Sequence, residues 1–411
     1  MEGENSSLYP RVMIPEELPT SVRARDEAAR RFGAFADTYF EAMWAGDPLA
    51  DAFVADFDTL GHGAGLKLLR TACRDGVPEG APPSLRALFD QLEAVPAWVD
   101  FPALDAASAH AARYVRQSGI ALGAASLVSG YANAAASRPL EMTGRYLDNA
   151  GARTIEVASW LAAVSEPGGL GRYSTGFELT VRVRIIHALV RRSLAGRADW
   201  DAAAWGVPIC QAFLAYTLVE FCLIPLRAMR AIGAPQRPFE SDAAYARWRY
   251  LGYLLGIDEA LLPRDRGEQE RLEEIYLLTR PPVDEYCRTL VGAINTDFLV
   301  PELEGLLPGR ARRLAPNVVH GLERIFVGDV IADELGIPAT RLTTVIRAVG
   351  PVLRVVNGVL DRIPAALAAR TRAGQRYQAE QDALLRAKYD VHHDLVDASP
   401  ATARSHPARA T

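Results

Sequence analysis

One long helix, delimited at both ends by its own sequence, constrains the fold of this chain most strongly. Thr175-Gly176-Phe177-Glu178 has the pattern of a capping box, in which a hydroxyl and a carboxylate satisfy free amides of the first helical turn. Gly196, about five turns later, is a typical helix stop. The alternation from Val181 to Ile185 also fits a β-strand, but the cap and the apolar continuation to Leu194 favour a helix.

Residues that start or stop helices also occur throughout the rest of the chain. Proline and glycine positions predict helices over about 138–148 and 151–165, and another from Pro208 to about Ile232 with a kink at Pro225. Further helices are predicted at 243–255, 267–278, 283–299, 316–335, 339–357 and 363–389. We therefore predict an all-α protein with one large helical domain over 30–395, an N-terminal extension over 1–29 and a disordered tail over 396–411.

Composition excludes several classes of protein. The 411 residues carry a net charge of −5 and a pI near 5.9, so no broad basic surface for nucleic acid is expected. The first 19 residues lack the basic and apolar regions of a signal peptide, which favours a cytoplasmic protein. The uncharged stretches 117–137 and 202–219 are too polar or too interrupted for a bilayer, so we expect buried helices and no transmembrane segment.

His187 is the most suggestive residue of the long helix. On a helical period it shares its face with Thr180, Val183, Val190 and Leu194, so its ring should point into an apolar interior. Arg184 and Arg191 lie one turn to either side. A neutral imidazole binds iron and guanidinium groups pair with propionates, so this pattern suits a buried haem. The alternative is a hydrogen-bonded core histidine with solvated arginines.

A second arginine lies at the end of an apolar stripe on the preceding helix. Arg153 aligns with Val157, Trp160, Leu161 and Val164, although a surface arginine with a buried stem would show the same pattern. Other metal chemistries lack their motifs. The chain has no Glu-x-x-His for a di-iron centre, no His-Glu-x-x-His for a zinc peptidase, and no paired aspartates for magnesium-diphosphate chemistry.

Several segments together resemble a known family. They are Gly46–Asp51, Pro96–Asp100, Pro139–Arg145, Pro167–Leu170, Val181–Arg191 and Trp205–Gln211. In order and spacing they resemble the latex-clearing protein or rubber oxygenase family, which is grouped with the ER-bound oxygenase of mycophenolic acid biosynthesis. The resemblance covers about residues 30 to 370. It implies an all-α fold with a globin-like core, one haem b, and O2-dependent cleavage of an isoprenoid carbon–carbon double bond to carbonyl products.

The resemblance also implies roles for particular residues. His187 matches the proximal haem ligand, and Arg184 and Arg191 flank it as candidate cofactor-binding residues. Arg153 matches the distal arginine. Glu141 is the nearest candidate for the catalytic glutamate, although it also suits a first-turn carboxylate favoured by the helix dipole.

The chain departs from the family at the distal lysine. The matching position falls on Glu156 or, in a shifted register, on Arg153, and no lysine occurs between Lys67 and Lys388. Glu156 and Thr154 complete the candidate distal residues. This departure and the missing signal peptide argue against rubber as the substrate, so we expect a small apolar olefin, with an unidentified electron donor. The alternatives are a haem-binding sensor or carrier without turnover, and a helical protein that binds an apolar ligand without haem.

Overall fold

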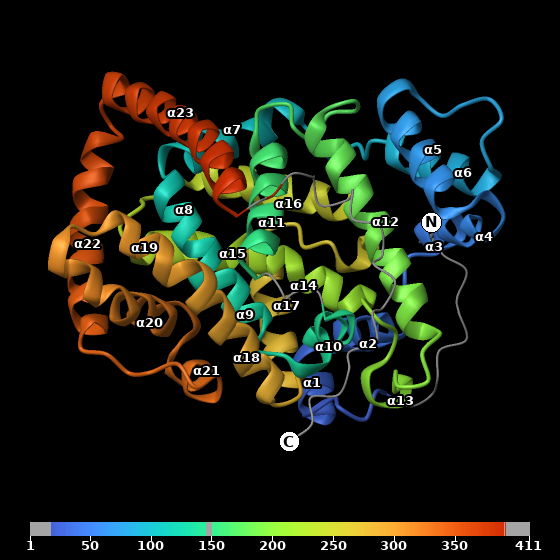
Figure 1. The fold of residues 1–411 in the computed structure, drawn as a ribbon, viewed down its shortest axis with the longest axis horizontal. Helices are drawn as coiled ribbons and strands as arrows, with labels where there is room; N and C mark the ends of the chain where they lie inside the picture. The colour runs from blue at the N-terminus through green and yellow to red at the C-terminus, as the bar shows by residue number, and fades with distance from the viewer. Residues whose placement is uncertain (1–17, 145–149, 390, 392–411) are drawn as a thin grey trace.

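The computed structural model describes residues 18–144, 150–389 and 391, and every regular element in this part of the chain is a helix (Figure 1). The predicted all-α class is therefore confirmed for the described residues. Helix α1 already begins at Arg25, inside the predicted N-terminal extension. The predicted tail, 396–411, lies outside the described residues.

The N-terminal third consists of short helices. They are α1 (Arg25–Phe32), α2 (Ala34–Glu41), α3 (Pro48–Ala55), α4 (Phe57–Leu60), α5 (His62–Asp75) and α6 (Pro83–Glu93). Asp47 caps α3 by accepting a hydrogen bond from the amide of Ala50, and Pro48 occupies the first helical position, where its missing N–H costs nothing.

The middle of the chain contains the helices that carry most of the candidate residues. They are α7 (Phe101–Arg113), α8 (Val115–Ala121), α9 (Val128–Gly130), α10 (Ala134–Thr143), α11 (Ala150–Ser165), α12 (Thr175–Ala195) and α13 (Ala202–Trp205), with a π-helical segment at Leu122–Leu127. Helix α12 packs against α11, α3, α5 and α16, which places it in the interior.

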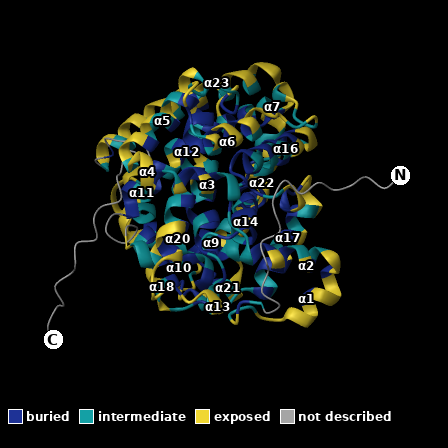
Figure 2. Ribbon diagram, turned by 90° about the vertical axis from the view of Figure 1, so that its right-hand side faces the viewer, coloured by how far each residue is buried: buried dark blue, intermediate teal, exposed yellow. Residues whose placement is uncertain are grey.

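The C-terminal half adds further helices around this centre. They are α14 (Gln211–Phe221), α15 (Leu223–Ala231), α16 (Pro238–Leu254), α17 (Arg266–Thr279), α18 (Glu285–Ile294), α19 (Val300–Leu306), α20 (Ala315–Val327), α21 (Asp329–Glu334), α22 (Leu342–Leu360) and α23 (Pro364–Lys388). A main cluster of buried apolar residues extends from Ala28 to Tyr276. Figure 2 shows the buried residues gathered in the middle of the molecule.

The cap of α12 differs from the prediction by one residue. Ser174 is the N-cap, and its hydroxyl accepts a hydrogen bond from the amide of Phe177 at 3.1 Å, while Thr175 is exposed. Glu178 does not close a capping box, because its carboxylate pairs with Arg74 Nε at 2.7 Å. The helix itself, 175–195, is confirmed, and the strand alternative over 181–185 is wrong.

Helix α10 begins earlier than predicted. Asn133 caps it by accepting hydrogen bonds from the amides of Ala135 and Ala136, so Pro139 lies inside the helix and not at its start. The stop is also earlier, at Gly144, which has the positive φ of 66° that favours glycine. The final predicted residues, 145–148, lie outside the described residues.

Three long predicted helices are interrupted. The apolar helix predicted from Pro208 begins at Gln211 and is interrupted at Cys222, three residues before Pro225, because a proline cannot bond to the carbonyl four residues back. The helix predicted over 316–335 divides into α20 and α21 at Gly328, whose φ is 83°. The helix predicted over 283–299 ends in a π-helical turn at Asn295–Leu299 and continues as α19.

Candidate functional site

The side chain of His187 lies partly buried on α12, between the two arginines of the same helix. Its Nδ1 atom is completely buried and has no hydrogen-bond partner among the described residues. Burial, with a smaller contribution from the positive charge of Arg191, lowers the pKa of His187 to about 4, although Asp47 acts in the opposite direction. The imidazole is therefore neutral at neutral pH, the form that can ligate a metal ion.

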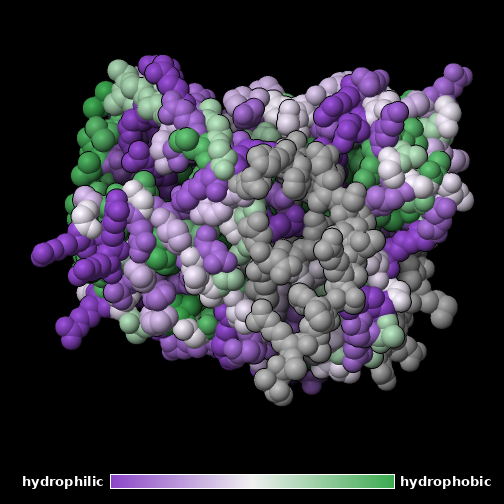
Figure 3. Space-filling view, in the orientation of Figure 1, coloured by the Kyte–Doolittle hydropathy of each residue, from purple (hydrophilic) through white to green (hydrophobic). Residues whose placement is uncertain are grey.

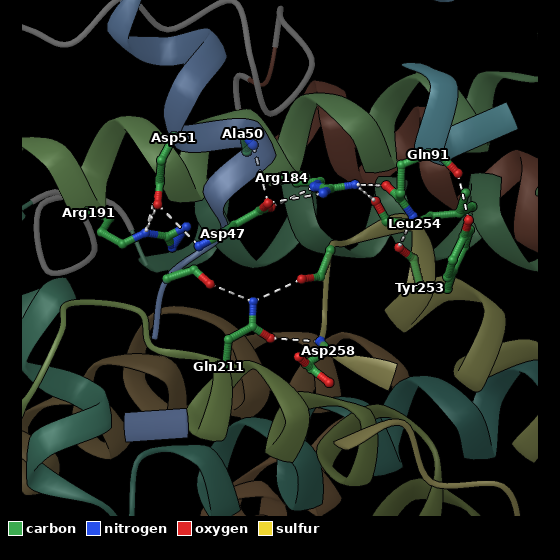
Figure 4. A network of polar contacts seen from close by, with 12 residues as sticks. Asp47, Ala50, Asp51, Gln91, Arg184, Arg191, Gln211, Tyr253, Leu254 and Asp258 are labelled. Atoms are coloured by element: carbon green, nitrogen blue, oxygen red, sulfur yellow. Dashed lines mark hydrogen bonds and ion pairs between the residues drawn. The ribbon is translucent and has the colours of Figure 1, made fainter. Parts of the chain in front are cut away.

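Arg184 is committed to a buried network. Its Nε donates to Asp47 Oδ2 at 2.6 Å, and its Nη1 donates to Gln91 Oε1 at 2.6 Å and to the carbonyl of Leu254 at 3.3 Å (Figure 4). Both ion-pair partners are almost fully buried, with side chains 1% and 2% exposed. Arg184 thus joins α12 to the N-terminus of α3 and the C-terminus of α16.

Arg191 makes a second connection between α12 and α3. Its Nε lies 3.1 Å from both carboxylate oxygens of Asp51 (Figure 4). Its Nη1 donates to the carbonyl of Ile209 at 3.1 Å. Its Nη2 is buried without a hydrogen-bond partner among the described residues. Burial raises the pKa of Asp51, and Arg191 opposes that shift. Arg191 therefore keeps a buried donor that a further anion could use.

We expect Asp47→Asn to destabilise the protein by about 3 kcal/mol, because it leaves the buried guanidinium of Arg184 without its counter-charge. Urea unfolding followed by circular dichroism measures the change. Asp51→Asn is the matched control: its carboxylate is 37% exposed, so the expected loss is about 1 kcal/mol. Equal losses for the two variants would contradict the structural role assigned to Asp47.

Helix α11 turns its predicted stripe toward α12. Trp160 Nε1 donates to Thr180 Oγ1 at 3.1 Å, and Arg153 lies about two turns away on the same face. Arg153 forms an ion pair with Glu156 of its own helix. The hydroxyl of Thr154 donates to the carbonyl of Ala150 at 2.8 Å and so serves its own helix. The structure therefore brings Arg153 and Glu156 together.

Glu141 lies in the last turn of α10, so its interpretation as a first-turn carboxylate is wrong. It forms an ion pair with Arg138, which also pairs with Asp284 at 2.8 Å. Arg197, just beyond α12, donates to the carbonyl of Met142 at 3.3 Å. The ends of α10 and α12 are therefore neighbours, and Glu141 lies near the helix of His187 while paired with an arginine of its own helix.

An apolar cavity of about 310 Å³ lies on the opposite side of α11. Ile155 and Ala158 line it, and at 100° per residue they face away from Arg153 and Trp160, while Leu161, which also lines it, lies between the two faces. Leu161, predicted to share the stripe of Arg153, therefore also reaches the cavity. Side chains of α8, α19, α20 and α23 also line the cavity, among them Ile120, Leu303, Leu322 and Leu385.

A comparison with known protein families identifies the family of this chain. The model of the catalytic domain of the family "ER-bound oxygenase mpaB/B'/Rubber oxygenase" matches residues 112–356, more than half of the chain, and this range contains His187, Arg153 and Glu141. The chain belongs to this family. The resemblance seen in the sequence motifs is thereby confirmed.

Two relatives extend the comparison of this rubber oxygenase family member. The rubber oxygenase of Streptomyces sp. (strain K30) is 24% identical over 272 residues, which are 64% of this chain and 62% of that protein. The structure of latex clearing protein LCP in the closed state superposes with a TM-score of 0.64 at 20% identity, over 82% of this chain and 91% of that chain. The second likeness supports the helical fold.

One further residue of this oxygenase-family protein was not identified as a candidate from the sequence. Glu220 of α14 has an enclosed carboxyl group whose pKa is raised by burial to about 8. Gly130 of α9 makes room for it, because a Cβ there would lie 2.5 Å from Glu220 Oε1. The carboxylate charge contributes to the raised pKa values of Tyr216 and Tyr276, whose rings stack at 3.4 Å. The available signal was one carboxylate following the uncharged stretch 202–219.

Proposed function

We propose that this protein is a haem b-dependent oxygenase that cleaves the carbon–carbon double bond of a small isoprenoid or other olefinic substrate with O2. Membership of an oxygenase family supports the reaction class. The observation that carries the cofactor assignment is His187, a neutral imidazole on an interior helix with a buried Nδ1 that lacks a hydrogen-bond partner among the described residues. Such an imidazole fits an iron ligand.

Arg191 and Arg184, the other two candidate residues of α12, differ in how well they suit haem binding. Arg191 keeps a buried Nη2 without a partner in the described part of the chain, so it suits a propionate. Arg184 is bound to Asp47, Gln91 and Leu254, so we assign it to positioning α12 and His187. When bound, haem would supply the iron that activates dioxygen.

The residues of α11 and α10 would act on developing charge and on protons. A guanidinium held in place in a dry site stabilises negative charge far more strongly than one in water, and the ion pair with Glu156 holds Arg153 in place. Glu141 remains our candidate for removing an allylic proton, which would require that it leave Arg138.

The apolar cavity supports a substrate of isoprenoid character. Its volume of about 310 Å³ is at the lower end of ordinary ligand sites. A smaller pocket of about 90 Å³ shares Leu122, Leu161 and Ser165 with it and extends to Phe221 and Trp248. An apolar chain entering the cavity could thus be guided around α11 toward Phe221 and Trp248, whose rings pack against Trp160 on the face of α11 that carries Arg153.

Turnover under labelled dioxygen tests this function. A panel of prenyl and terpenoid olefins is incubated with the haem-loaded protein under ¹⁸O2, and we expect mass spectrometry to detect labelled carbonyl products. Arg153→Ala should slow turnover by roughly two to three orders of magnitude, the typical loss for one positioned donor, while haem absorbance is retained. Label-free products would contradict the oxygenase reaction, a variant as fast as the wild type would contradict the role of Arg153, and the absence of products from every olefin would favour a non-catalytic haem protein.

A further inference from the structure

Helix α22 presents an apolar surface to the outside of the molecule. Six of its valines, Val345, Val349, Val352, Val355, Val356 and Val359, are each 45–68% exposed. Only 11% of its most apolar window is buried, against 67% for the similarly apolar stretch Gln211–Ala231 in the core. Figure 3 shows the hydrophobic side chains along the upper left edge, where α22 lies in Figure 1. Exposed apolar patches of this kind mark interaction sites.

The face that attaches α22 to the body is narrow and combines small and polar residues with Ile346, which packs beside Gly321. Gly350 lies so close to the carbonyl oxygen of Ala231 that a Cβ would be 1.9 Å from it. Asn357 Nδ2 donates to the carbonyl of Gly233 at 2.7 Å. A surface helix of a soluble protein normally turns its apolar face inward, so the polarity of α22 is inverted.

The charges on α22 are all positive. The segment 335–360 contains Arg341, Arg347 and Arg354 but no aspartate or glutamate, and Asp361 and Arg362 follow it. Arg341, Arg347 and Arg362 are exposed, and the only ion pair of Arg347 in the described structure is a 3.9 Å contact with Asp329. Apolar side chains flanked by long arginines suit a membrane interface, where the apolar groups enter the acyl region and the guanidinium groups reach lipid phosphates.

We propose that α22 docks this protein onto a lipid bilayer that contains anionic lipids, lying in the plane of the interface. The helix is long and apolar enough to cross a membrane. However, it is fixed along its length to α15 and α20, and two arginines interrupt its middle, so an in-plane position fits better. The absence of a transmembrane segment stays a prediction.

A second copy of the chain fits this surface less well. A twofold dimer joins the same patch of both subunits, and pairing two α22 helices through their exposed valines would add further arginines but no counter-charge for Arg347 and Arg354. Like charges at such a contact oppose association, whereas anionic lipid headgroups would neutralise them. This proposal does not depend on the oxygenase activity.

Vesicle co-sedimentation tests the proposal with the full chain. Wild-type protein should sediment with vesicles of phosphatidylcholine containing about 30% phosphatidylglycerol, and less with phosphatidylcholine alone or at high salt. The double variant Val352→Asp, Val356→Asp should partition at least about tenfold more weakly. Val330→Asp is the matched control, because Val330 is 74% exposed on α21, outside the patch, and it should bind like the wild type.

Two controls keep the outcome decisive. Circular dichroism establishes that the double variant is folded. Light scattering after size exclusion reports the oligomeric state. Wild-type protein that stays in the supernatant with both vesicle types would overturn the proposal. A wild-type dimer that the double variant dissociates, without vesicle binding, would overturn it in favour of a protein contact.

Discussion

Replacing His187 by alanine is expected to abolish haem binding and, with it, all oxygenase turnover. The expectation follows from the neutral imidazole on α12 and from its buried Nδ1, because an axial ligand has to offer an unprotonated nitrogen. The measurement is the Soret absorbance of protein purified in parallel with the wild type, before and after reconstitution with hemin. We expect about one haem per wild-type chain and no specific haem in the variant.

A matched control separates ligation from a general effect of losing a histidine. His320 of α20 is also partly buried, and burial lowers its pKa as well, but it lies outside the α11–α12 region. His320→Ala should keep the wild-type Soret band. A wild-type protein without a Soret band after reconstitution would refute the haem assignment, and a His187→Ala variant with an unchanged spectrum would refute the choice of ligand.

Features that depend on neighbouring residues in the chain were mostly predicted correctly, whereas features that depend on distant residues were not. Helix α12 was predicted correctly at 175–195 because caps and hydrophobic periodicity are local properties. The errors arose where a neighbouring residue offered a better local bond: Ser174 replaced Thr175 as the cap, and Asn133 started α10 before Pro139. Such competitions involve small energies, so a sequence pattern cannot decide them.

The candidate site was only partly accessible to sequence reasoning. The face of α12 that holds His187 follows from helical spacing. The partners of its arginines do not, because Asp47 and Asp51 lie more than 130 residues away in the chain. Asp47 and Asp51 were visible in a family motif, but only the fold pairs them with Arg184 and Arg191. The apolar surface of α22 was missed for the same reason, since its sequence resembles that of a buried helix.

Glu220→Gln is expected to remove a large part of the pH dependence of stability. The carboxyl pKa is about 8 in the folded protein and near its ordinary value of 4.5 in the unfolded chain. Between these values only the folded protein keeps the proton. Its free energy of unfolding therefore falls with rising pH, by roughly 5 kcal/mol in total. Below pH 4.5 the carboxyl group is protonated in both states, so the free energy of unfolding is not reduced. Above pH 8 it is ionised in both states, and the reduction is complete.

Glutamine has the shape of the protonated carboxyl but does not titrate. The variant should match the wild type near pH 4.5 and exceed its stability by several kcal/mol at pH 8.5, as measured by urea unfolding at both pH values. Glu323, whose pKa burial also raises to about 8, titrates in both proteins and cancels in the difference. A difference that is the same at both pH values would show that the carboxyl of Glu220 is already ionised at neutral pH.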